Sequence, residues 1–319
     1  MEWFLAGLGL VILLLAGDAL VRGAVNLSLR LGVPALIVSL TIVAFGTSAP
    51  ELLIALSALK DNAPGIAMGN VVGSNTANIL LVLGFPAMLA ALHTSECDTR
   101  KTYVYMLLAT LLFIGMAFFG TFTWISGVIL LGALALILFD QLHEARCHRR
   151  DGRAADNVVD ELDELEGADP DMPWWRICLF LTLGLVGLPL GADLLVDSAV
   201  VIATRFGVSD TVIGLTLVAL GTSLPELATT TMAALRKQAD VALGNVIGSN
   251  MFNLLAIIGI ASLVGPIPVD KSFLYFDLWV MLAASAMLMP FVFFKQDIGR
   301  VWGAALTALY LLYIIVVLT

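Results

Sequence analysis

Long apolar runs, separated by short polar or Gly- and Pro-containing breaks, extend along almost the whole chain. Runs of about 18 or more apolar residues are long enough to cross a bilayer as helices. Cutting the chain at the breaks predicts ten spans, at residues 3–21, 34–59, 66–90, 102–120, 124–139, 174–201, 209–235, 241–265, 273–294 and 299–318. The pattern therefore predicts an all-α integral membrane protein with ten transmembrane helices.

The composition agrees with this prediction. Hydrophobic residues make up 60% of the 319 residues and charged residues only 13%, whereas soluble domains contain about 25% charged residues. Most of the net charge of -9 lies in one hydrophilic segment around residues 151–171. Because this segment has few large apolar residues, we expect an acidic linker at 141–173. It separates a first five-helix unit at 1–140 from a second at 174–319.

Several other classes of site are disfavoured by the residues present. Cys97, Cys147 and Cys178 have no paired spacing, which argues against a disulfide framework or a zinc site. The acidic linker lacks the spacing of a calcium-binding EF-hand loop, and the chain lacks a Walker A sequence, which argues against ATP-driven pumping. We therefore expect no cofactor and no nucleic-acid partner. The expected partners are the lipid bilayer and transported ions. The oligomeric state is left open, with a monomer expected to suffice.

Lys and Arg residues are distributed unevenly between the two sides of the predicted bundle. If the N-terminus is outside, thirteen of them fall on the inner side, and the outer side keeps only Lys60, Arg205 and Lys271. Positive charge accumulates on the cytoplasmic side of membrane proteins. We therefore expect a multi-pass protein of the plasma or inner membrane, with both termini outside and the linker in the cytoplasm.

The chain contains an internal repeat. Residues 41–84 align without a gap to residues 216–259, at an offset of 175, and about twenty of the forty-four positions are identical. Each copy contains five predicted spans, so the second copy enters the membrane from the opposite side. Inverted repeats of this kind are typical of secondary transporters, whose site lies at the midplane between the repeats. A channel can also be built from such repeats, so topology alone leaves the mode of transport open.

Two polar clusters interrupt the apolar pattern of each copy, GTSxPE in the second span and GNVxGSNxxN in the third. On a helix, Thr47, Ser48 and Glu51 share one face, and Ser74 lies one turn before Asn78. The second copy supplies the equivalents Thr222, Ser223, Glu226, Ser249 and Asn253. The glycine pairs Gly69/Gly73 and Gly244/Gly248 form GxxxG faces, which we expect to pack closely against the glutamate helices.

Both glutamates fall near the middle of their spans. A charged group at the bilayer centre costs about 2.5–3.5 kcal/mol, so it persists where it is paired or functional. Because no basic residue lies in the interior of a predicted span, the two carboxylates require a cation or bound protons. Pro50 and Pro225 remove helical hydrogen bonds and free carbonyls nearby. An all-oxygen site of this kind suits calcium or sodium and not zinc or copper.

These residues resemble the α-repeats of the cation/calcium exchanger superfamily, which includes the sodium/calcium exchangers. The matching motifs are GTSAPE with GNVVGSNTAN and GTSLPE with GNVIGSNMFN. The resemblance implies that Glu51 and Glu226 bind calcium at the centre. It also implies that the calcium and sodium sites are completed by Thr47, Ser48, Thr222, Ser223, Ser74, Ser249, Asn78 and the carbonyls of Ala44 and Ala219.

One position departs from the family pattern. Many sodium/calcium members carry Asp where this chain has Asn253, so its centre offers two negative charges and not three. We expect an antiporter that exchanges calcium for sodium by alternating access, with the first and sixth spans sliding as the family implies. A proton- or potassium-dependent antiporter and a cation channel stay open as alternatives. An intramembrane enzyme is disfavoured because the three histidines lie in predicted loops.

Overall fold

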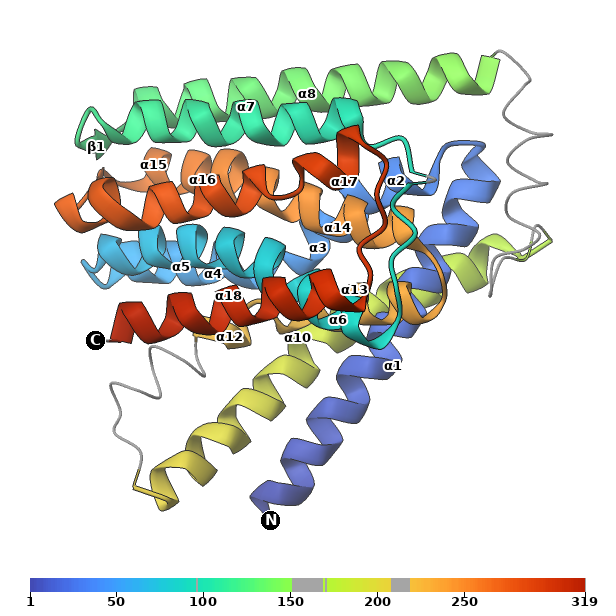
Figure 1. Ribbon diagram of the computed structural model, residues 1–319, viewed down its shortest axis with the longest axis horizontal. Helices are drawn as coiled ribbons and strands as arrows, with labels where there is room; N and C mark the ends of the chain where they lie inside the picture. The colour runs from blue at the N-terminus through green and yellow to red at the C-terminus, as the bar shows by residue number, and fades with distance from the viewer. Residues whose placement is uncertain (96, 151–168, 170, 208–218, 319) are drawn as a thin grey trace.

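The computed structural model describes residues 1–95, 97–150, 169, 171–207 and 219–318. Its first half contains α1 (Glu2–Leu31), α2 (Ala35–Val38), the π-helical η1 (Ser39–Val43), α3 (Ala44–Thr47), α4 (Ala49–Lys60), α5 (Pro64–Ala77), η2 (Asn78–Val82), α6 (Gly84–Leu89), α7 (Arg100–Ala117), β1 (Thr121–Phe122) and α8 (Trp124–Arg150). Its second half contains α10 (Trp174–Arg205), α12 (Ala219–Gly221), α13 (Leu224–Leu235), α14 (Ala239–Met251), η4 (Phe252–Ile257), α15 (Ile258–Val264), β2 (Ile267–Pro268), η5 (Phe273–Asp277), α16 (Leu278–Ala286), α17 (Met289–Phe293) and α18 (Arg300–Leu318). Most helices lie side by side along the long axis, and α1 and α10 leave the bundle at an angle (Figure 1).

Eight helical segments of the described chain are long and apolar enough to cross a membrane, and each coincides with a predicted span. The predicted span 102–120 forms α7, where Arg100 and Lys101 occupy the first turn and lower the mean hydropathy. The predicted span 209–235 is described only from residue 219 onwards. The predicted acidic linker lies largely outside the described residues.

The first span is longer than the sequence predicts. Its helix continues past residue 21 to Leu31 and ends at Gly32, whose φ of 64° places it in the left-handed region. The predicted end was wrong because Arg22, which interrupts the apolar run, is accommodated inside the helix. Its guanidinium pairs with Asp18 one turn earlier at 3.0 Å, and its carbonyl accepts a hydrogen bond from Asn26.

Helices α1 and α10 pack closely against each other through glycine. A Cβ added at Gly9 would lie 2.7 Å from the nitrogen of Leu195, and one added at Gly184 would lie 2.5 Å from the Cβ of Leu20. Gly9 is equivalent to Gly184, and Leu20 to Leu195, at the 175-residue offset of the sequence repeat, so the two contacts are equivalent. The start of α1 therefore meets the later part of α10 and the reverse, so the two equivalent helices run antiparallel.

The connecting loops of the two halves also have matching features at positions 175 residues apart. Strands β1 and β2 pair antiparallel through Phe122 and Ile267, and Leu92 forms a bridge with Ile298. Leu92 is equivalent to Ile267, yet the loop that contains it lies at the end of the bundle opposite β1 (Figure 1). The positive φ angles pair in the same way, Gly32 with Gly207, Asn62 with Lys237 and Gly120 with Lys295. Equivalent loops at opposite ends are what an inverted duplication predicts.

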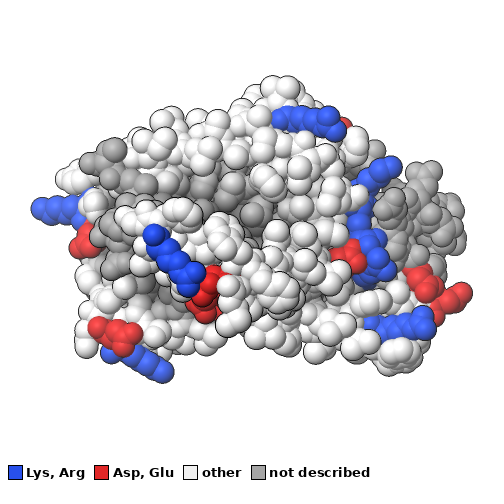
Figure 2. Space-filling view, turned by 90° about the horizontal axis from the view of Figure 1, so that it is seen from below, with Lys and Arg blue, Asp and Glu red and all other residues white. Residues whose placement is uncertain are grey.

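The surface is suited to lipid. Charged side chains lie mostly toward the two ends of the long axis, with wide uncharged areas between them (Figure 2). Large apolar side chains such as Leu53, Leu136 and Val301 are 68%, 72% and 82% exposed. A soluble protein rarely exposes apolar surface on this scale, so a bilayer covers it.

The predicted glycine packing is confirmed for one of the two GxxxG faces. A Cβ at Gly244 would lie 2.8 Å from the carbonyl oxygen of Leu36, and one at Gly248 would lie 2.5 Å from that of Leu40. Helix α14 therefore approaches the backbone of the second span closely. For Gly69 and Gly73 the equivalent partners fall within 208–218, outside the described residues.

Candidate cation-binding site

The GTSxPE motifs form helix breaks with the same geometry in both halves. Ser48 has φ −85° and ψ 5° between α3 and α4, and Ser223 has φ −88° and ψ 2° before α13. Each proline lies in the first turn of the helix that follows, where its missing N–H costs nothing. The prediction of a proline inside a continuous helix was therefore wrong, because the chain starts a new helix there. Glu51 and Glu226 lie in these first turns, where the helix dipole and free N–H groups favour carboxylates.

Both glutamate side chains are fully buried. One oxygen of Glu226 accepts hydrogen bonds from the hydroxyls of Ser48 at 3.2 Å and Ser249 at 3.4 Å. The other oxygen of Glu226 and both oxygens of Glu51 have no hydrogen-bond partner among the described residues. Ser48 belongs to the first repeat, so its bond to Glu226 brings the two GTSxPE motifs together.

Threonine and asparagine side chains join the repeats in equivalent pairs. Thr47 donates to Oδ1 of Asn245 at 3.3 Å, and Thr222 donates to Oδ1 of Asn70 at 3.3 Å. Asn245 also donates to Thr230 at 3.1 Å. The position equivalent to Thr230 is Ala55, which offers no acceptor to Asn70, whose Nδ2 has no partner among the described residues.

Serine hydroxyls lie beside these pairs. Ser223 approaches Ser74 with 3.5 Å between the oxygens, and the Thr47 hydroxyl lies 3.4 Å from that of Ser249. The predicted hydroxyl residues of both repeats thus share one buried cluster at the crossing of the broken helices with α5 and α14.

Four asparagines cross between α5 and α14. Asn78 donates to Oδ1 of Asn250 at 3.0 Å, and Asn253 donates to Oδ1 of Asn75 at 3.1 Å. Asn78 begins η2 and Asn253 lies in η4, so two of the four π-helical segments of the described chain contain asparagines predicted as ligands; single π turns occur often at functional sites. The Oδ1 atoms of Asn78 and Asn253 are buried and unpartnered among the described residues.

Apart from Asn70 Nδ2, the atoms of this cluster that have no hydrogen-bond partner among the described residues are oxygens, which can bind a cation. They are both carboxylate oxygens of Glu51, one of Glu226, and the amide oxygens of Asn78 and Asn253. No Lys or Arg of the described chain forms a salt bridge with either glutamate. Nor do the described residues contain a group of three or more His, Cys, Asp or Glu that could hold a metal. Two carboxylates with neutral oxygens suit a hard cation such as calcium, which takes six to eight oxygen ligands.

Comparison with known proteins agrees with this chemistry. Residues 1–142 and 177–319 match the sequence model of the family described as sodium/calcium exchanger protein. The chain belongs to the sodium/calcium exchanger family. Members of this family are membrane transporters and not enzymes.

Relatives match over nearly the whole chain. The sodium/calcium exchanger MaX1 of Methanosarcina acetivorans is 33% identical, with 97% of this chain and 96% of that protein covered. The inner membrane protein YrbG of Escherichia coli is 32% identical, with 96% and 93% covered. A solved structure of the sodium-calcium exchanger NCX_Mj, soaked without sodium and calcium, matches with a TM-score of 0.80 at 32% identity, covering 99% and 98% of the chains. The chain is thus a membrane cation exchanger by family.

The backbone carbonyls that the resemblance implied lie at the helix breaks. The Ala44 carbonyl accepts a hydrogen bond from the Ser48 N–H at 3.0 Å. The Thr47 hydroxyl, which has one proton, lies 3.3 Å both from this carbonyl and from Oδ1 of Asn245, so one lone pair of the carbonyl is free when that proton points to Asn245. Ala219 begins α12. Their role as ligands stays a prediction.

Four further residues belong to this cluster although they were not among the predicted ligands. Asn70 and Asn245 hydrogen-bond the threonines, and Asn75 and Asn250 hydrogen-bond Asn253 and Asn78, the two asparagines predicted as ligands. A signal was present, because all four are identical between the repeats within GN and GSN. Asn75 and Asn250 were missed because each follows its serine directly and so lies off the face shared by Ser74 and Asn78.

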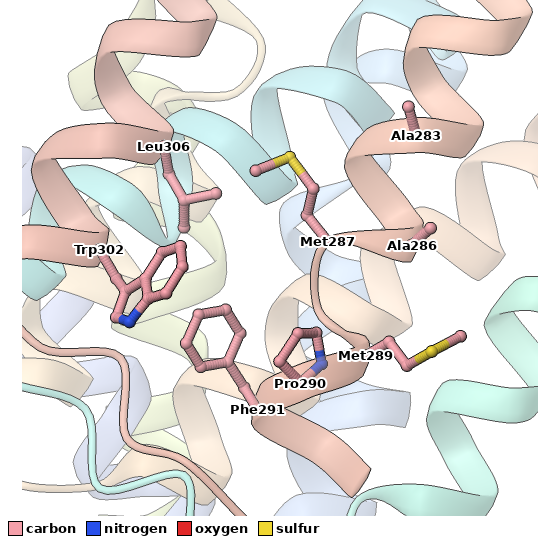
Figure 3. Close-up of a pocket in the computed structure, with 8 residues that line it drawn as sticks. All are labelled: Ala283, Ala286, Met287, Met289, Pro290, Phe291, Trp302 and Leu306. Carbon is pink, nitrogen blue, oxygen red and sulfur yellow. The ribbon is translucent and has the colours of Figure 1, made fainter. Parts of the chain in front are cut away.

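A separate cavity of about 470 Å³ lies between α16, α17 and α18 (Figure 3). Its lining is apolar, with Trp302, Leu306, Phe291, Pro290 and Met287 converging on it. It contains none of the predicted ligands. The cation-site prediction therefore concerns the glutamate cluster, which this cavity does not touch.

Proposed function

We propose that this chain is an antiporter that exchanges calcium for sodium across the membrane, with Glu51 and Glu226 as the central cation ligands. The observation that carries the proposal is the set of buried oxygens of Glu51, Glu226, Asn78 and Asn253 that have no partner in the described part of the chain, two on Glu51 and one on each of the others. Burying an ionised carboxylate without a basic partner costs several kcal/mol of free energy, which is similar to the cost of inserting a charged side chain at the bilayer centre. A transported cation offsets that cost in a protein of this family.

The remaining ligands follow from the hydroxyl cluster. Thr47, Ser48 and Ser74 from the first repeat, and Thr222, Ser223 and Ser249 from the second, supply neutral oxygens beside the carboxylates. The carbonyls of Ala44 and Ala219 complete the set once the helix breaks rearrange. Calcium and the counter-ion compete for the two glutamates, so they occupy the site in turn.

The proposed architecture is ten transmembrane helices in two inverted five-helix repeats. It is supported by the antiparallel packing of α1 on α10 and by equivalent loops at opposite ends of the bundle. In such a protein the two repeats exchange conformations, which opens the midplane site to each side in turn. The charge bias supports an orientation with both termini outside and the linker in the cytoplasm.

Calcium flux into liposomes tests the proposal. Purified protein is reconstituted, and calcium uptake is measured with sodium, potassium or proton gradients imposed separately. We expect uptake driven by sodium, and uptake driven only by potassium or by a pH jump would assign the counter-ion to the alternative exchangers. Flux that requires no counter-ion would instead indicate a channel.

Substitutions at the glutamates test the ligands directly. Glu51→Gln and Glu226→Gln each remove one negative charge while keeping the side-chain size. We expect both to reduce exchange at least about a hundredfold, since an unmatched cation in a buried site costs several kcal/mol. A matched control is Glu2→Gln, at the surface and paired with Arg205, which should transport normally. Robust calcium uptake by both glutamate variants would exclude the proposed site.

A further inference from the structure

Asn75 and Asn250 are buried polar residues that do not belong to the predicted ligand set. Each is at most 1% exposed. Each donates its side-chain Nδ2 to the other's backbone carbonyl, at 3.4 Å in both directions. Each Nδ2 also lies 3.8 Å from a methionine sulfur, of Met281 and Met106 respectively. Asn75 and Asn250 are equivalent positions of the two repeats, and each makes the same contacts with the other repeat.

The direction of these hydrogen bonds is fixed by chemistry. A backbone carbonyl only accepts, so Asn75 and Asn250 must turn their NH₂ groups toward it. Their amide oxygens then face the other way and can only accept. The groups that meet them, Nδ2 of Asn253 and Nδ2 of Asn78, must donate, as they do at 3.1 and 3.0 Å.

These hydrogen bonds decide which atoms of Asn253 and Asn78 face the proposed ion site. Once the NH₂ group of Asn253 is committed to Asn75, its Oδ1 is the atom left over, and that atom is buried and unpartnered among the described residues. The same holds for Asn78 against Asn250. An ionised aspartate at position 253 would have no proton to donate and would set a carboxylate oxygen against the Asn75 amide oxygen. Asn75 therefore selects an uncharged donor at this position.

We infer that Asn75 and Asn250 are positioning residues that hold Asn253 and Asn78 as neutral carbonyl ligands, and so limit the charge of the site to that of Glu51 and Glu226. This rests on the proposed function. One calcium ion or two monovalent cations then neutralise the site, and a third monovalent cation would leave a net charge buried at the midplane, which is costly. The exchange is therefore electroneutral, one calcium for two monovalent ions.

The first test counts charge in the full chain reconstituted in liposomes. Calcium uptake and charge movement on a solid-supported membrane are recorded in parallel under the gradient that drives uptake. We expect no net charge for each calcium ion moved. Net charge movement with calcium uptake overturns this inference and leaves the antiporter proposal intact, whereas absence of calcium uptake under every gradient refutes the antiporter proposal itself.

The second test uses the Asn75–Asn253 contact. Asn253→Asp should lower flux about tenfold, because it replaces a hydrogen bond with two facing oxygens. Adding Asn75→Ala removes the opposing oxygen, so the double variant should regain most of that flux and carry net charge. A purely structural role for Asn75 would make the double variant worse than either single variant, and that outcome overturns the inference.

The matched control exploits the repeat. Asn250 is as buried as Asn75 and makes the same backbone bond, but it holds Asn78 and not Asn253. Asn250→Ala should therefore fail to rescue Asn253→Asp. Equal rescue by Asn75→Ala and Asn250→Ala would show a general loosening of the helix crossing and would contradict the assignment. Thermal unfolding of each variant checks that it is folded, and the charge count on the unmodified chain is independent of all of them.

Discussion

The two angled helices of the exchanger are alike where they cross and differ in the charges that flank the crossing. On α1, Asp18 pairs with Arg22 at 3.0 Å and with Arg236 in the α13–α14 loop. The three equivalent positions of the other repeat are Asp193, Asp197 and Asp61, all acidic and all exposed. None of these three forms a salt bridge with a described residue. At α1 these three positions thus carry opposite charges, and the three equivalent positions at α10 and the α4–α5 loop carry only carboxylates.

This difference gives the two states of the proposed transport cycle unequal energies. In an inverted-repeat transporter, each repeat adopts in one state the arrangement its partner has in the other. In the alternate state α10 would approach the α4–α5 loop as α1 now approaches the α13–α14 loop. That move would break the Asp18–Arg236 pair and bring carboxylates toward one another. The charges therefore favour the arrangement described here.

The largest effect is expected from removing Arg236. Its side chain is 14% exposed and that of Asp18 20%, so Arg236→Ala leaves a largely buried aspartate with only Arg22. Breaking a buried pair costs about 3–5 kcal/mol and breaking an exposed pair about 0–1 kcal/mol. We expect a loss near 3 kcal/mol, measured by denaturation in detergent. Arg205→Ala is the matched control, because Arg205 pairs with Glu2 while 59% exposed, and an equal loss there would refute the argument.

A smaller effect is expected from exchanging the charges between the ends. Arg236→Asp combined with Asp61→Arg removes the pair at α1 and offers Asp193 a partner in the alternate state. The population should shift toward that state by about tenfold, equivalent to about 1.4 kcal/mol. Spin labels at Leu15 and Lys237, in a background without native cysteines, would report a longer distance between α1 and the loop. An unchanged distance distribution would show that these charges do not set the balance.

Some of these features can be predicted from the sequence and others cannot. The glutamates and their hydroxyl neighbours were predictable because they recur at a fixed offset and lipid rejects an unpaired carboxylate. The Asp18–Arg236 pair was not, because 218 residues separate its members and only the folded chain brings them together. The helix breaks were not predicted, since a sequence shows that Pro50 weakens a helix but not that Ser48 ends one. The contacts among the four asparagines could not be predicted, because they form only where α5 packs against α14 and no local sequence pattern indicates that packing.

The smallest effect is expected at the loops that close the two ends of the bundle. At one end the β1–β2 pair buries the apolar Phe122. At the other end the equivalent position is Asp297, which accepts hydrogen bonds from the Ser95 backbone N–H at 3.0 Å and lies 3.0 Å from His93. Burial alone would raise the pKa of Asp297, but the hydrogen bonds from Ser95 and the His93 contact outweigh it and lower the pKa below 3.8.

Because the folded pKa of Asp297 lies below the unfolded one, its ionised form stabilises the folded state. That contribution is complete above the unfolded pKa, near 3.8, and is lost as the pH falls through the folded pKa. Asp297→Asn should therefore unfold at a temperature that depends less on pH between about 5 and 3 than that of the unmodified chain. The partly exposed carboxyl limits the effect to a shift of a few degrees at most. Phe122→Leu, at the apolar end, should leave the pH dependence unchanged, and a flattened profile in that variant would remove the proposed difference between the two ends.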